Sequence, residues 1–202
     1  MKIRSRVLAL ALAGVMSLSL AACGTTKKPE DGTLDDVKFL PANETDTAQK
    51  LLGIPGDTAL ITVNGTPITA ETYLYFLITN ISSYQQYISQ YGVSELDWTQ
   101  ESEGKTLGDY MKDQSKQAAI SYLLYSEKAK EKNLTLSPES LQDMIDTRSG
   151  VIDQIGGETA YGDALQRLGI SDSALWSINT AGSLYDVILE SELGAAPAAK
   201  DP

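Results

Sequence analysis

The chain has 202 residues, with 16 Lys and Arg against 27 Asp and Glu, and a formal net charge of −11. It contains no histidine and one cysteine, which excludes His-dependent triads, His-ligated metals and an intramolecular disulfide. The acidic balance argues against nucleic acid as a partner. No glycine-rich phosphate-binding motif is present, so we expect no cofactor and no metal site.

The first 22 residues have the organisation of a secretion signal. Three basic residues within the first six precede an apolar stretch, 7–20, which is too short to span a membrane comfortably. The closing phrase Leu20-Ala21-Ala22-Cys23 resembles the bacterial lipobox, in which the cysteine is lipidated and becomes the first residue. We therefore expect cleavage after residue 22, lipidation of Cys23 and a place on the extracytoplasmic face of a cell membrane. The alternative is an ordinary signal with a chance cysteine.

Residues 23–57 are predicted to be a flexible linker, because they are rich in Thr, Asp, Lys and Pro and have little periodic apolar content. Val37, Phe39 and Leu40 are apolar and could dock on a domain, but the composition favours a spacer. Loss of the signal would change the net charge from −11 to −14, which argues against lying flat on an anionic membrane. Residues 195–202 are a second linker-like segment, so the folded domain is predicted to span 58–194.

The folded domain is predicted to begin with a short hairpin and a long helix. Apolar residues alternate over Ala59–Val63, and Asn64-Gly65 follows, a pair that suits the positive φ angles of a type I′ turn. Thr69 is a good N-cap for a helix that runs to about Gly92. Seven positions of this helix form an amphipathic stripe that we expect to face the core: Ala70, Leu74, Leu77, Ile81, Tyr84, Ile88 and Tyr91.

Four further helices are expected, and each has a recognisable start or end. Thr106 begins the second helix, which runs to about Asn133, and Ser137-Pro138 begins the third. Gly169 is expected in the left-handed region at the end of the fourth, and Ser171 caps the fifth. The predicted fold is mainly α: five helices with one short N-terminal β-strand or hairpin.

The phrase Ala59-Leu60-Ile61-Thr62-Val63-Asn64-Gly65-Thr66-Pro67-Ile68-Thr69 resembles the opening of the SurA/PrsA family of extracytoplasmic foldases. The stretches Ala129–Leu134 and Gln166–Ser171 resemble later family phrases in the same order, and the resemblance covers nearly all of 58–194. The lipobox is similar to that of the PrsA branch, the Gram-positive lipoproteins. This resemblance implies a chaperone-like helical domain.

Members of that family usually carry a parvulin-type peptidyl-prolyl isomerase domain after the helical domain. Only eight residues follow Gly194 here, and the chain has none of the histidines that parvulin pockets typically use. We therefore expect no catalytic residues and no isomerase activity from this chain alone.

The sequence favours a binding module for unfolded or secreted polypeptides, anchored to the membrane through Cys23. Two alternatives stay open: the N-terminal part of an isomerase whose catalytic domain is not in this chain, and a structural envelope lipoprotein with one fixed partner. Aromatic and Met side chains adapt to varied clients, but each could equally be core. The candidate client-binding residues are Tyr75, Phe76, Tyr87, Tyr91, Trp98, Tyr110 and Met111.

Overall fold

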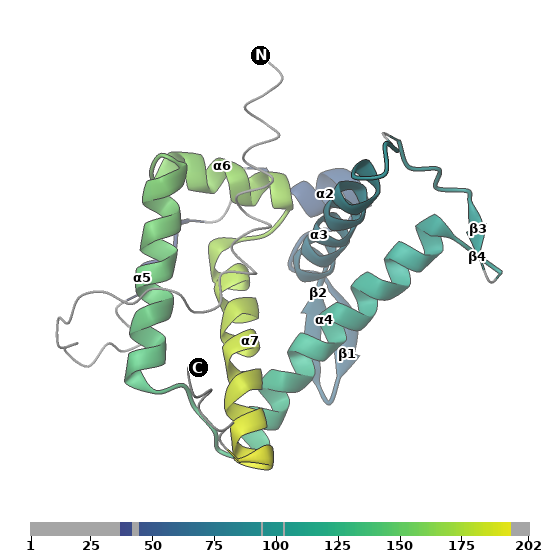
Figure 1. Ribbon diagram of the computed structural model, residues 1–202. Coiled ribbons are helices and arrows are strands. Elements are labelled where there is room, and N and C mark those ends of the chain that lie inside the picture. The colour runs from purple at the N-terminus through teal and green to yellow at the C-terminus, as the bar shows by residue number, and fades with distance from the viewer. Residues whose placement is uncertain (1–36, 42–44, 94, 103, 195–202) are drawn as a thin grey trace, which may run out of the picture.

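Three long helices form the centre of the computed structural model: α3 (Ala70–Ser89), α4 (Leu107–Glu131) and α7 (Asp172–Leu193) (Figure 1). The structure describes residues 37–41, 45–93, 95–102 and 104–194, so the predicted signal, Cys23 and the 195–202 tail lie outside the described residues. Helix α4 packs against α3 and α7, and the pair α5 (Pro138–Ile155) and α6 (Glu158–Leu168) lies on the other side of α7 from α4. The predicted mainly α fold is confirmed.

A small hairpin precedes α3, as the Asn-Gly pair predicts. Strand β1 (Ala59–Val63) pairs antiparallel with β2 (Thr66–Thr69). Asn64 and Gly65 have φ angles of 51° and 87°, the positive values that a two-residue turn of this kind requires.

The predicted helix starts are also observed. At each start, the capping side chain accepts a hydrogen bond from the backbone N–H three residues later, which satisfies an otherwise unpaired amide. The four capping residues are Thr69, Thr106, Ser137 and Ser171. Gly169 ends α6 with a φ of 67°, in the left-handed region.

The main core lies where the first half of α3 meets α4, α6 and α7. Phe76 packs its ring against Tyr75 and Tyr122, with centroid distances of 5.4 and 5.1 Å. The buried residues of this cluster are Ile68, Tyr75, Phe76, Ala119, Tyr161, Leu165, Ile170, Leu175 and Ile178.

The predicted core stripe of α3 is correct only at its beginning. Ala70 and Leu74 are buried, but the four middle positions of the stripe are half-buried and Tyr91 is exposed. Asn80 Nδ2 donates to Ser115 Oγ at 3.1 Å, which marks the contact between α3 and α4. Most side chains of α3 after residue 81 are exposed, so the end of the helix has few neighbours to bury it.

The linker prediction is wrong for the described residues before β1. A short helix, α2 (Thr47–Leu52), lies there, and its Ala48 packs with Ala70 and Leu74 in a second small cluster. Asp46 caps α2 by accepting from Gln49 N and also accepts from Gly56 N, at 2.9 and 2.8 Å. Six residues are too few to show helical periodicity, so the composition of the segment decided the prediction.

A second hairpin stands in the predicted loop between α3 and α4. It consists of β3 (Glu101–Ser102) and β4 (Lys105–Thr106), and it leads directly into α4.

Across the part of the chain that the structure describes, no helix combines the length and apolar content needed to cross a membrane.

Candidate functional site: an aromatic surface at the end of α3

Three tyrosines gather at the C-terminal end of α3 and just after it: Tyr84 is half-buried, whereas Tyr87 and Tyr91 are exposed. Tyr84, Tyr87 and Tyr91 recur at steps of three and four, so their rings lie along one side of the helix. The centroids of Tyr87 and Tyr91 are 5.2 Å apart, and Tyr84 lies 6.5 Å from Tyr87. Tyr87 is 55% exposed and Tyr91 69%, so both present most of their rings to solvent.

A shallow hollow of about 320 Å³ lies between α3 and the segment that follows it, and none of the three tyrosines lines it. Ile81 and Gln85 line it from the helix, and Leu96 and Trp98 line it from the loop. Val93 and Trp98 are both large, apolar and exposed. Tyr87, Tyr91, Val93 and Trp98 together are called the α3-end surface below.

The polypeptide backbone ties this loop to the start of α4. Gly108 N donates to the carbonyl oxygen of Trp98 at 3.2 Å, and Leu107 N donates to that of Gln100 at 2.9 Å. Tyr110 is exposed on the first turn of α4, close in the chain to these contacts. The hollow is therefore formed by a helix end and a loop that is fixed at its other end.

The structure separates the seven predicted client-binding residues into two groups. Four are exposed: Tyr87, Tyr91, Trp98 and Tyr110. The prediction is wrong for Tyr75, Phe76 and Met111, which are 3%, 5% and 3% exposed and belong to the interior. They lie in the parts of α3 and α4 that are covered by neighbouring elements, so they present no surface to a client in this fold.

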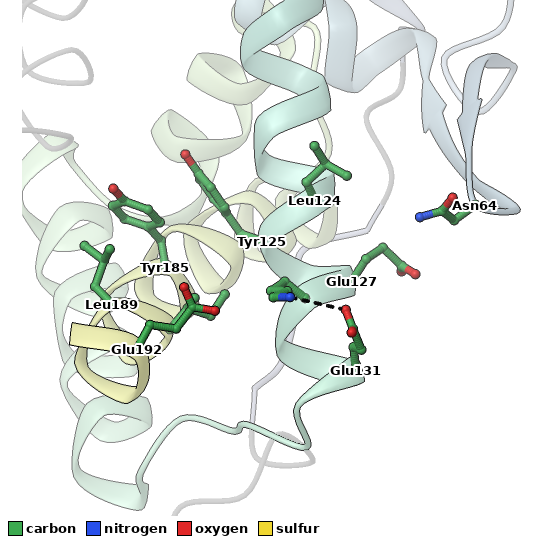
Figure 2. A pocket seen from close by; sticks show the side chains of 10 residues that line it. Asn64, Leu124, Tyr125, Glu127, Glu131, Tyr185, Leu189 and Glu192 are labelled. Atoms are coloured by element: carbon green, nitrogen blue, oxygen red, sulfur yellow. Dashed lines mark ion pairs between the residues drawn. The ribbon is translucent and has the colours of Figure 1, made fainter. Parts of the chain in front are cut away.

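A wider groove, not expected from the sequence, lies between the C-terminal halves of α4 and α7 and the tip of the β1–β2 hairpin (Figure 2). Its volume is about 560 Å³. The rings of Tyr125 and Tyr185 lie side by side in its lining, with centroids 4.6 Å apart. Its charged rim is paired: Lys128 bonds Glu131 at 3.6 Å, and Lys132 bonds Glu192 at 3.0 Å. The rim therefore offers little unpaired charge to a ligand.

A buried carboxylate, Asp172, lies at the start of α7. Its Oδ1 accepts from Arg148 Nε at 3.1 Å and from Tyr161 OH at 2.9 Å. Its Oδ2 accepts from Leu40 N at 2.9 Å and pairs with Arg148 Nη2. Four donors thus occupy the carboxylate, which leaves it poorly placed to act as an acid or base.

These donors also control the ionisation of the cluster. Burial alone would raise the pKa of Asp172, but the hydrogen bonds from Arg148, Leu40 N and Tyr161 outweigh burial and lower it. Burial, followed by the adjacent Asp172 charge, raises the pKa of the Tyr161 phenol. Asp172 therefore stays ionised, and its role in this geometry is to hold other groups in place.

The described residues contain no group of three or more His, Cys, Asp or Glu side chains able to hold a metal ion. Searches of protein-family models, curated proteins and solved structures find no match to this chain. The resemblance to the SurA/PrsA family therefore stays a prediction from the sequence, and the site must be argued from its own geometry.

Proposed function

We propose that this chain is a membrane-anchored extracytoplasmic module that holds unfolded or secreted polypeptides on its α3-end surface. The observation that carries the proposal is the exposure of Tyr87, Tyr91, Val93 and Trp98 at the end of α3 and in the segment after it, where Trp98 lines a hollow of about 320 Å³. Large apolar side chains that are exposed close together in the chain commonly mark an interaction site.

The side chains of the α3-end surface suit a client that varies in sequence. Tyr and Trp offer a large apolar face together with a polar edge, and they lose little conformational entropy when they bind. The surface is open, so an extended chain can lie across it without a matching pocket for each residue. Binding of this type is weak and broad, and it needs no catalytic group.

A chaperone assay with a matched control tests the proposed surface. Tyr87→Ser/Tyr91→Ser should reduce the ability of the full chain to suppress aggregation of a denatured model protein on dilution. Leu51→Ser/Leu193→Ser removes two residues that are at least as exposed elsewhere on the molecule, and it should leave suppression unchanged. If the tyrosine variant retains normal helicity and full suppression, the α3-end surface is not the client site.

The proposed anchor rests on the signal and on the Leu20–Cys23 phrase. Two acyl chains hold a protein on a membrane stably, whereas one binds only marginally. Mass spectrometry of protein purified from bacterial membranes should find Cys23 as the first residue, carrying a diacylglyceryl group. An unmodified thiol at Cys23, or cleavage at another position, would refute the anchor without affecting the client surface.

A further inference from the structure

Residues 37–41 lie on α5, α6 and α7 as a short segment without regular secondary structure, called the strap below. Two hydrogen bonds hold its main chain. Leu40 N donates to Asp172 Oδ2 at 2.9 Å, and Arg148 Nη2 donates to the carbonyl oxygen of Lys38 at 3.2 Å. Both bonds involve backbone atoms of the strap, so they do not depend on which side chains it carries.

Two apolar side chains of the strap complete the contact. The ring of Phe39 meets Trp176 edge-on, with centroids 6.1 Å apart and an interplanar angle of 62°. Leu40 packs against the main core cluster, next to Gly162. The strap is thus bound as an extended peptide would be, by backbone bonds and by an aromatic residue followed by an aliphatic one.

The Trp176 ring, which Phe39 contacts, carries a donor without a partner in the described part of the chain. Trp176 is 6% exposed, and its indole N–H is buried without a hydrogen-bond partner among the described residues. A buried donor without a partner costs free energy, and a chain that places a carbonyl there would recover it. Arg148, Asp172 and Trp176 are called the strap seat below.

The strap itself is held by few contacts. Lys38, Phe39 and Pro41 are exposed, and only Val37 and Leu40 are half-buried. Segments with little buried apolar surface open at a lower free energy than the core of a domain. The strap can therefore leave the seat while α5, α6 and α7 stay folded.

We propose that the strap seat is a second polypeptide-binding site, which the chain's own residues 37–41 occupy, and that an extended client segment containing an aromatic-aliphatic pair displaces them. The strap is then an autoinhibitory contact. That the displacing molecule is an unfolded polypeptide rests on the proposed function. The existence of the site rests only on the hydrogen bonds to Arg148 and Asp172.

A synthetic peptide with the strap sequence, blocked at both ends and spanning residues 36–42, is the probe. Its binding to the full chain is measured by fluorescence anisotropy. Because a closed strap reduces apparent affinity by the fraction of molecules that are open, Phe39→Ala should bind the peptide about tenfold more tightly than the wild type. Phe39 is exposed, so this variant should fold normally. A peptide with Ser in place of its Phe and Leu should not bind.

Two further measurements locate the bound peptide. Excess peptide should speed hydrogen exchange of the Leu40 amide in the wild-type chain, because the strap is displaced. Tyr87→Ser/Tyr91→Ser should leave peptide affinity unchanged. Equal affinity for wild type and Phe39→Ala, or a Leu40 amide that stays protected at saturation, would overturn the seat as a binding site. Failure of the aggregation assay alone would count only against the α3-end surface.

Discussion

The two halves of α3 have the same kind of residues and opposite surroundings. Near its start, Tyr75 and Phe76 lie in the core, and burial raises the pKa of the Tyr75 phenol well above its usual range. Three turns later, Tyr87 and Tyr91 are mostly exposed. The difference comes from the neighbours: α4, α6 and α7 all pack against α3, whereas its end extends past them (Figure 1). Aromatic content along one helix therefore does not by itself separate core from surface.

Phe76→Ala should show the largest effect in the buried half. Phe76 contacts two other rings, and truncation leaves a cavity, so the free energy of unfolding should fall by about 3–5 kcal/mol. Urea denaturation followed by circular dichroism measures this. A loss below about 1 kcal/mol would mean that this half of α3 is not the core.

Asp172→Asn should give the next largest loss in the free energy of unfolding. The first half of α3 is linked to this region because Glu71 Oε2 accepts from Ser171 N at 2.9 Å. Removing one partner of a buried ion pair costs about 3 kcal/mol, because the other charge stays buried.

The same carboxylate gives the wild type an acid dependence with a defined sign. The pKa of Asp172 is lowered in the folded state, so its stabilising contribution is complete above the unfolded pKa of about 3.9 and is lost as the pH falls through the lower, folded value. Unfolding free energies measured between neutral pH and about pH 2 should therefore fall less steeply with acid in Asp172→Asn than in the wild type. Parallel curves would show that other carboxylates determine the acid response.

Gly169→Ala should cause an intermediate loss in the free energy of unfolding, because it disturbs the contact with the buried half of α3. Gly169 has a φ of 67°, and a left-handed conformation costs a non-glycine residue about 1–2 kcal/mol. The added Cβ would also collide with the side chain of Leu74 in α3, whose Cγ would lie 3.1 Å away. Gly53→Ala is the control, because it has a similar φ of 76° but open space around the new Cβ. The difference between the two variants reports the packing of Leu74.

Tyr87→Ser/Tyr91→Ser should have the smallest effect on stability. Exposed positions outside the core usually change the unfolding free energy by no more than about 0.5 kcal/mol each. The thermal midpoint should stay near that of the wild type even though client binding falls. A large loss of helicity would show that these tyrosines support the fold, and the contrast between the two halves of α3 would disappear.

Local signals in the sequence predict the elements of this fold well. Thr69, Thr106, Ser137 and Ser171 cap helices as expected, and Asn64-Gly65 makes the expected turn. These features depend on a few neighbouring residues, so a single sequence carries them. Burial depends on which helices cross and where. The sequence alone therefore could not distinguish the buried candidates, Tyr75, Phe76 and Met111, from the exposed ones.

Contacts between distant parts of the chain account for the other misses. The bond from Leu40 N to Asp172 joins residues 132 positions apart, and Asp172 in the sequence looks only like an acidic residue in the first turn of a helix. Helix α2 did leave a local signal, because Asp46 and Gly53 are the residues expected at its two ends. The composition of the surrounding segment outweighed that signal.

The strap also determines how the domain would respond to mechanical force. A pull on the chain before Val37 reaches Arg148 and Asp172 first, because these side chains hold the strap on α5 and α7. While those bonds last, α2 and the β1–β2 hairpin carry no tension. Only after the strap detaches would the force pass to Thr47, whose hydroxyl donates to the carbonyl oxygen of Gln166 at 2.6 Å. The domain would therefore yield in two steps, with the strap released before α2 is loaded.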